Sequence, residues 1–120
     1  MQDMYQNFQG PIPREFEEEF GAEVESDPTE GVHVVRFKEV TGEDFSISYS
    51  TTQGSVRAQL RDGNQFAVVD IFREGVTRLR IQSGKGDSSI VIDYGDQEFT
   101  GVLQIQIFPR VQITDRMLFT

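Results

Sequence analysis

Few residues of this chain could do acid–base or covalent chemistry. His33 is the only histidine, and it alternates with core-type positions, which indicates a strand residue rather than a general base. Asp70 and Asp93 could meet across strands as a catalytic carboxylate pair, but strand acids beside arginines usually form solvated ion pairs. The chain has no cysteine and no serine in a G-x-S-x-G context, so covalent catalysis lacks support. We do not expect an enzyme.

Two polar segments resemble ligand loops only superficially. The segment SGKGDSS, residues 83–89, lacks the G-x-x-x-x-G-K-[ST] spacing of a phosphate-binding loop and lies between predicted strands. The segment DYGDQE, residues 93–98, does not have the ligand order of a calcium loop. The first is interpreted as a hairpin loop and the second as a turn, and no cofactor or metal is expected.

Negative charge is concentrated near the start of the chain. Residues 1–30 contain nine acidic residues and one basic residue, whereas residues 31–120 contain eleven acidic and ten basic residues. The net charge of −9 therefore belongs mainly to the first quarter of the sequence. Because nucleic-acid binding depends on a surplus of lysine and arginine, this distribution disfavours a nucleic-acid partner.

The acidic segment REFEEEFGAEVESDPTEG, residues 14–31, has two interpretations. It is either a solvated face that keeps the protein soluble, or a recognition surface for a basic protein. Clustered like charges repel one another in the folded chain, and scattered acids would serve solubility equally well. This argument favours a partner-binding surface on a helix and the turn after it, and its predicted residues are Glu17, Glu18, Glu19, Glu23, Glu25 and Asp27.

The elements that carry this surface follow from hydrophobic periodicity. Pro13 suits the first turn of a helix, and Phe16 and Phe20 lie four residues apart on one face, so we predict a helix over 13–20 that ends at Gly21. From Val32 onward, apolar and polar residues alternate, with turn residues about every ten positions. The dense apolar run FAVVDIFR, residues 66–73, is interpreted as a central strand.

These elements predict a mainly β protein: an antiparallel β-sandwich or half-barrel of seven to eight strands with one short N-terminal helix. The 120 residues suit a single domain, in which residues 1–10 are expected to be flexible, 13–20 helical and 32–120 an antiparallel sheet. The start of the sequence has no signal-peptide pattern and no stretch is long enough for a membrane span, so a cytoplasmic protein with no membrane partner is expected.

The segment DIFREGVTRLRI, residues 70–81, resembles a strand–turn–strand pattern of bacterial immunity proteins, which inhibit polymorphic toxins and contact-dependent growth inhibition effectors. The resemblance covers about a tenth of the chain, and the size and acidity agree with it. It implies a non-enzymatic protein that binds a basic cognate toxin domain, often a nuclease, with acidic side chains that mimic substrate phosphates.

Three hypotheses therefore remain. The first is an immunity protein that neutralises a basic toxin through the acidic residues. The second is a small-ligand-binding β-barrel or small enzyme, which requires an apolar cavity with convergent polar groups inside the sheet. The third is a self-associating structural or assembly subunit, which would pair through free strand edges or through the face near Gln104 and Gln106.

Overall fold

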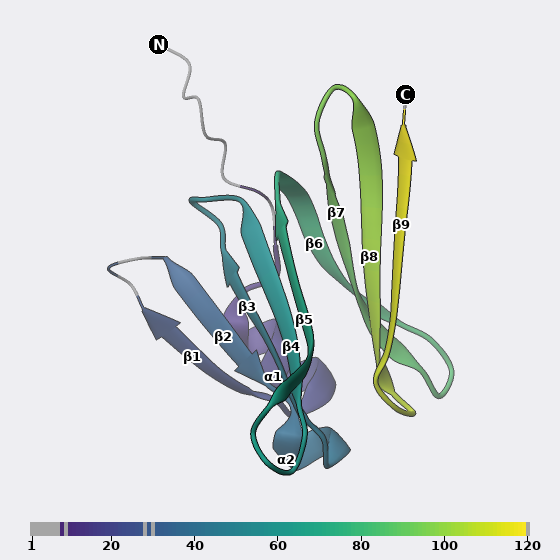
Figure 1. The fold of residues 1–120 in the computed structure, drawn as a ribbon. Helices are drawn as coiled ribbons and strands as arrows, with labels where there is room; N and C mark the ends of the chain where they lie inside the picture. The colour runs from purple at the N-terminus through teal and green to yellow at the C-terminus, as the bar shows by residue number, and fades with distance from the viewer. Residues whose placement is uncertain (1–7, 9, 28, 30, 120) are drawn as a thin grey trace.

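The structure, a computed structural model, describes residues 8, 10–27, 29 and 31–119, and it consists of two antiparallel sheets and two helices (Figure 1). The first seven elements are α1 (Pro13–Phe20), β1 (Glu23–Asp27), β2 (Val32–Arg36), α2 (Lys38–Thr41), β3 (Asp44–Ser50), β4 (Ser55–Arg61) and β5 (Ala67–Glu74). The remaining four are β6 (Val76–Ser83), β7 (Ser88–Gly95), β8 (Phe99–Phe108) and β9 (Gln112–Phe119). None of the helices in the described residues is long and apolar enough to cross a membrane.

Each sheet is a simple meander of neighbouring strands. The five-stranded sheet has the order β1-β2-β3-β4-β5, and the four-stranded sheet has the order β6-β7-β8-β9. The mainly β, antiparallel fold class predicted from sequence is confirmed. The structure has more strands than the seven to eight expected, because the sheet begins at Glu23 rather than at residue 32. The one-turn helix α2 was also not anticipated.

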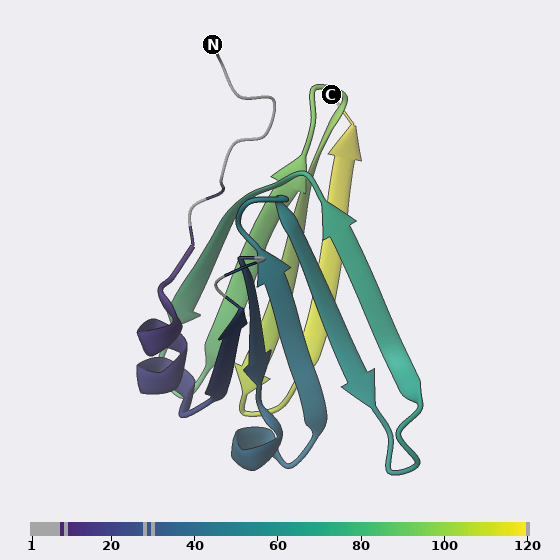
Figure 2. The same ribbon diagram turned by 90° about the vertical axis from the view of Figure 1, so that its left-hand side faces the viewer.

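The two sheets are joined by a tight corner rather than by a loop. Gly75 connects β5 directly to β6, and Figure 2 shows the two strands diverging from this point. Gly75 has a φ of +70°, and a Cβ atom there would lie 3.0 Å from the carbonyl oxygen of Gly95. Glycine suits this position because it tolerates both the left-handed backbone and the close approach. The strand–turn–strand pattern of residues 70–81 is therefore present, but as a corner between sheets.

One hydrophobic core lies between the sheets and draws on both. Alternate residues of β3 and β8 point inward, and the most deeply buried side chains include Phe45, Ile47, Ile90, Ile92, Leu103, Ile105 and Ile107. This alternation is the pattern that the sequence shows in DFSISYS and VLQIQIF, where small polar residues and glutamines occupy the other face.

The interpretation of FAVVDIFR as a central strand is wrong. β5 is the last strand of the five-stranded sheet, and Phe66, Val68 and Phe72 are exposed. One face of this edge strand points inward, and Ile71 on that face packs against the core. Several other apolar side chains of the run are uncovered. β7, with the shorter run IVI, is the buried interior strand of the other sheet.

Helix α1 is held by two aromatic side chains. It has the bounds predicted from sequence, with Pro13 in its first turn and Gly21 as a left-handed cap whose N–H donates to the Glu17 carbonyl at 2.8 Å. Phe16 has no exposed surface. Phe20 contacts Phe37, which follows β2, at a centroid distance of 5.5 Å and Phe108 of β8 at 6.5 Å. The helix therefore packs against both sheets.

The first ten residues fall largely outside the described part of the chain. The expectation of flexibility for residues 1–7 and 9 cannot be compared with the structure, because it lies outside the described residues. Phe8 is described and is buried, with its ring 6.1 Å from that of Tyr49. The aromatic side chains that pack around Tyr49 therefore include Phe8, which precedes Pro11 in the chain.

A polar contact joins the sheets on another side of the core. Arg73 of β5 forms an ion pair with Asp115 of β9, and the hydroxyl of Tyr94 on β7 donates to the same carboxylate at 2.6 Å. The guanidinium of Arg73 also lies 5.5 Å from the centre of the Tyr94 ring. Hydrogen bonding from Arg73 to Asp115 raises the pKa of Arg73, which keeps the guanidinium charged. This contact links the outermost strands of both sheets.

Removal of the Phe20 ring tests whether aromatic packing holds α1. We expect Phe20→Ala to lower the free energy of unfolding by about 3–5 kcal/mol, because it opens a cavity where both sheets meet the helix. Urea denaturation followed by far-UV circular dichroism measures the loss. Phe66→Ala, at a position that is 69% exposed, is the matched control and should cost less than about 1 kcal/mol. Equal losses would contradict this account of the helix.

Candidate functional site

The acidic residues predicted as a binding surface lie on two adjoining elements, α1 and β1, and are all exposed. We call them the acidic surface: Glu17, Glu18, Glu19, Glu23, Glu25 and Asp27. Because Phe16 and Phe20 face the core, the glutamates of α1 are directed to its flanks and its solvent side. Only Gly21 and Ala22 separate the helix from the strand, and the two elements lie side by side in Figure 2.

The part of this surface expected on a turn is a strand. In β1, Val24 packs against the core, so Glu23, Glu25 and Asp27 lie on the opposite, outer face. The turn residues of ESDPTEG, residues 25–31, are the reason that the sequence predicts a turn here. The alternation of Glu23, Val24 and Glu25 was the available signal, but one apolar residue is too few to indicate a strand by itself.

Some of these carboxylates already have partners within the protein. Glu25 accepts from Arg36 Nε at 3.3 Å and Nη2 at 3.4 Å, in an exposed ion pair. Glu19 accepts from the Ser83 hydroxyl and, at 3.3 Å, from the Ser88 hydroxyl. Asp27 accepts from the backbone N–H of Thr29 at 2.9 Å.

The remaining charge of the surface is not neutralised. Among the described residues, neither Glu17, Glu18 nor Glu23 has a cationic side chain at ion-pair distance. The serine hydroxyls that bond Glu19 are neutral, so they orient its carboxylate without cancelling its charge. The acidic surface therefore keeps a net negative potential toward solvent.

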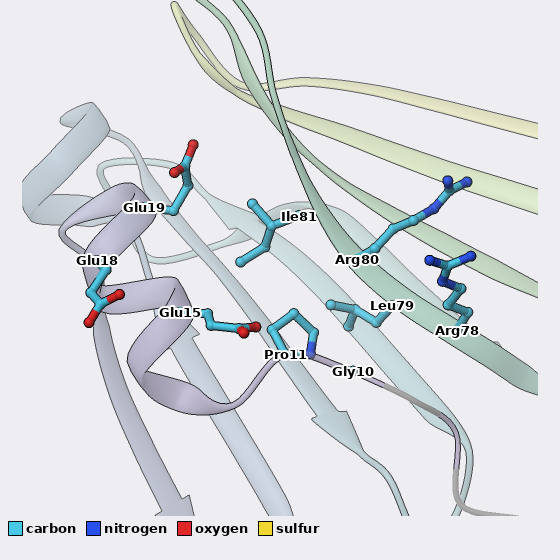
Figure 3. Close-up of a pocket in the computed structure, with 9 residues that line it drawn as sticks. All are labelled: Gly10, Pro11, Glu15, Glu18, Glu19, Arg78, Leu79, Arg80 and Ile81. Carbon is cyan, nitrogen blue, oxygen red and sulfur yellow. The ribbon is translucent and has the colours of Figure 1, made fainter.

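A groove lies between α1 and β6, and we call it the α1–β6 groove (Figure 3). Its volume is about 560 Å³, and it is lined by Gly10, Pro11, Glu15, Glu18, Glu19, Arg78, Leu79, Arg80 and Ile81. Leu79 is buried and Ile81 half-buried, and both point toward the helix. Glu15 was counted among the acids but not predicted as a site residue. The sequence does contain a signal for this residue: Glu15 lies four positions before Glu19, which places both on one flank of the helix.

The negative charge of Glu15 affects the ionisation of Tyr49. Burial raises the pKa of Tyr49 to about 12, and the negative charge of Glu15 adds to this increase because it opposes ionisation of the phenol. The Tyr49 hydroxyl donates to the carbonyl of Pro11 at 3.5 Å. Tyr49 thus stays protonated beneath the helix at neutral pH.

The residues considered for catalysis are not brought together. His33 shares a 2.7 Å hydrogen bond between Nδ1 and the Ser26 hydroxyl, and its ring lies 5.0 Å from that of Tyr49. Asp70 belongs to the five-stranded sheet and Asp93 to the four-stranded sheet, so the proposed carboxylate pair does not form. In the part of the chain that the structure describes, no three potential metal ligands of the His, Asp or Glu type form a group.

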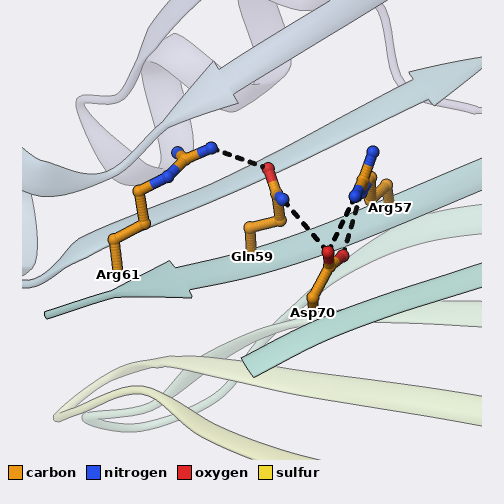
Figure 4. A network of polar contacts seen from close by, with 4 residues as sticks. All are labelled: Arg57, Gln59, Arg61 and Asp70. Carbon is orange, nitrogen blue, oxygen red and sulfur yellow. Dashed lines mark hydrogen bonds and ion pairs between the residues drawn. The ribbon is translucent and has the colours of Figure 1, made fainter. Parts of the chain in front are cut away.

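Asp70 instead belongs to a polar network on the five-stranded sheet (Figure 4). Arg57 donates to both of its oxygens, from Nε at 2.9 Å and from Nη2 at 2.7 Å, and Gln59 donates at 3.3 Å. Arg61 donates to the Gln59 carbonyl oxygen at 3.2 Å. The hydrogen bond from Arg57 lowers the pKa of Asp70. The network is an exposed ladder across β4 and β5, which agrees with the interpretation of strand acids as ion-pair partners.

The two segments that superficially resembled ligand loops are turns. The N–H of Gly84 donates to the carbonyl of Asp87 at 2.8 Å, which closes the connection from β6 to β7. Asp96 Oδ1 accepts from the N–H of Glu98 at 2.7 Å and from that of Phe99 at 3.3 Å. Both carboxylate and backbone groups are therefore used in local turn structure.

The space between the sheets is occupied by the protein itself. The residues with the least exposed surface there include large side chains from both sheets and from α1: Phe16, Phe37, Phe45, Ile47, Ile92, Leu103 and Ile105. A small-ligand barrel needs an apolar cavity in this position. The filled core argues against the hypothesis of a ligand or enzyme site inside the sheet.

The comparisons with known proteins give a likeness of fold. No protein-family model matches the chain, and no curated protein matches it significantly. One chain of a solved structure, described as a contact-dependent growth inhibition toxin–immunity protein complex from Klebsiella pneumoniae 342, has a similar fold with a TM-score of 0.81. The match covers 96% of this chain and 100% of that chain at 17% sequence identity. The fold of this chain is thus similar to that of one chain of this complex.

Ionisation of Tyr49 tests its electrostatic coupling to Glu15. The unfolded chain releases this proton near the ordinary pKa of 10.0, and the folded protein only near 12. Because the unfolded state then binds fewer protons, stability should fall as the pH rises from about 10 to about 12. Phenolate absorbance of the wild type and of Tyr49→Phe should isolate a group with a pKa of about 12. Glu15→Gln should lower it, and an unchanged value would contradict the coupling.

Proposed function

We propose that this protein is an immunity protein that binds a toxin domain and blocks its activity. The observation that carries the proposal is the likeness of fold to a chain of a contact-dependent growth inhibition toxin–immunity complex, which extends over the whole of that chain. The resemblance of residues 70–81 supports the same class independently of the fold. The proposed place of action is the cytoplasm, and the absence of cysteine is compatible with a reducing compartment.

The ion pairs and hydrogen bonds of the candidate acid–base residues favour the role of inhibitor over that of toxin. Asp70 pairs with Arg57, Asp93 lies 3.7 Å from Arg80, and His33 bonds to Ser26. These contacts use the candidate acid–base groups singly, in local pairs on separate strands. We therefore propose a binding protein without enzymatic activity.

The proposed partner is a basic toxin domain, and a nuclease fits this description. A nuclease binds a polyanionic substrate, so its active site is surrounded by positive potential. The acidic surface presents carboxylates in place of the substrate phosphates. Concentrated charge of one sign also accelerates encounter with an oppositely charged protein. The surface lies on a helix packed by Phe16 and Phe20 and on a strand paired to β2, both of which hold it rigidly.

Charge reversal on α1 tests the role of the acidic surface. We expect Glu17→Lys combined with Glu18→Lys to slow association with the toxin at low salt by tenfold or more, since steering depends on net charge, and to leave the fold intact. The probe is found first by sequencing the genes that flank the gene of this chain for a secreted protein with a basic carboxy-terminal domain, and that domain is then purified. Surface plasmon resonance at low and at high salt measures the association rate. These positions are chosen because Glu19 already contacts Ser83 and Ser88.

The matched control changes the same amount of charge elsewhere. Glu43→Lys combined with Glu98→Lys alters two exposed acids outside the acidic surface. The control should change association only slightly. If both double variants slow binding equally, net charge rather than the acidic surface governs encounter. If neither variant nor wild type binds the domain, the proposed function is wrong.

Self-association remains a second candidate because of one observation on β9. This strand is one of the two edge strands of the four-stranded sheet, and its Leu118 and Phe119 are 72% and 80% exposed. An uncovered apolar edge strand can pair with another chain.

Size-exclusion chromatography with light scattering tests this second candidate. A dimer that is lost in Leu118→Lys, and kept in Thr114→Lys on the same outer face of β9, would support pairing through the end of this strand. A monomer at all concentrations would eliminate the candidate.

A further inference from the structure

The α1–β6 groove has an apolar floor and an acidic wall. Its floor is formed by Pro11, Leu79 and Ile81, and its helical side carries Glu15, Glu18 and Glu19. Its volume of about 560 Å³ lies within the ~300–1,000 Å³ of typical ligand pockets. An occupant must therefore combine an apolar stem with a group that carboxylates bind.

The two arginines of β6 do not neutralise this wall. Alternation along the strand sends Leu79 and Ile81 toward the helix and the guanidinium groups of Arg78 and Arg80 away from it, as Figure 3 shows. Arg80 lies 3.7 Å from Asp93 on the neighbouring strand β7. Among the described residues, no basic side chain forms an ion pair with Glu15 or Glu18. With three glutamates and two arginines, the lining of the groove keeps a formal net charge of −1.

The wall is held in place from both sides. The ring of Phe16, adjacent to Glu15, is fully buried, and the Ser83 and Ser88 hydroxyls at the end of β6 and start of β7 bind Glu19. The helix and the strand are thus joined at one end of the groove by Glu19. The preorganised carboxylate of Glu19 loses little entropy when a cation binds, which favours a defined occupant.

Charge and shape together indicate the occupant. An arginine side chain has an apolar stem that can lie along Pro11 and Ile81, and a planar guanidinium that donates to several carboxylate oxygens at once. Lysine offers only a compact charge with a larger hydration cost. We propose that the α1–β6 groove is an arginine-binding site that receives a side chain of the toxin domain. This inference rests on the proposed function for the identity of the partner, but the chemistry of the groove can be tested without it.

The test uses a small probe and its neutral isostere. Nα-acetyl-arginine amide is titrated into ¹⁵N-labelled protein at low ionic strength, up to about 50 mM, which is above the millimolar dissociation constants expected of a fragment this small. We expect saturable shifts at the amides of Glu15, Leu79 and Ile81. Nα-acetyl-citrulline amide has the same shape without the charge, and it should bind about tenfold more weakly or not at all.

Two matched variants separate the groove from exposed acids elsewhere on the protein. Glu15→Gln removes a carboxylate that lines the groove and should weaken probe binding at least about fivefold. Glu98→Gln makes the same chemical change at an exposed residue that lies outside the groove and outside the acidic surface, and it should leave probe binding unchanged. Shifts that spread over β1, equal binding of citrulline, no saturable shift, or equal effects of the two variants would each overturn the proposal.

The same variants distinguish failure of the inference from failure of the proposed function. If the toxin domain binds Glu15→Gln as tightly as wild type and the probe does not bind, the groove proposal is wrong and the immunity function stands. If the probe binds as expected and the toxin domain does not bind at all, the arginine site stands and the proposed partner is wrong. If Glu15→Gln weakens both, both proposals are supported.

Discussion

The packing of two phenylalanines beneath α1 determines where the rest of the surface lies. A helix of eight residues is not stable alone in water, so its formation depends on tertiary contacts. Phe16 and Phe20 supply these contacts, and Phe20 touches aromatic residues from both sheets. Because this face of the helix packs against the core, the glutamates on its other faces point outward. The position of the acidic surface and the wall of the α1–β6 groove are both consequences of this packing.

The distribution of charge in the fold follows a simple division. In the two sheets, aspartates pair with arginines: Asp70 with Arg57, Asp93 with Arg80 and Asp115 with Arg73. Residues 31–120 contain eleven acidic and ten basic residues, so the charge of the sheets is nearly balanced. In α1 and the start of β1, carboxylates outnumber the nearby cations, and only Glu25 has an arginine partner among the described residues. The surplus of negative charge therefore lies on α1 and β1, which are the first elements of the fold.

The two sheets contribute rigidity rather than a cavity. Inward side chains of both meanders fill the interior, the Gly75 corner fixes how β6 leaves β5, and the Arg73–Asp115–Tyr94 contact joins strands from both. β6 is thereby directed toward α1, where its apolar residues face the helix. This arrangement provides a rigid support for the acidic surface. The likeness to a chain of a toxin–immunity complex concerns this same two-sheet framework.

The sequence by itself determined the local features of this protein. The Phe16–Phe20 spacing and Pro13 specified the helix, alternation specified most strands, and counting charges located the acidic segment, since each of these signals depends on neighbouring residues only. Tertiary structure decided the rest. It made residues 23–27 a strand through pairing with β2, placed the apolar β5 at an edge, and separated Asp70 from Asp93. It also brought Leu79 and Ile81 opposite Glu15, because contacts between residues more than sixty positions apart depend on how two sheets pack, which no local pattern encodes.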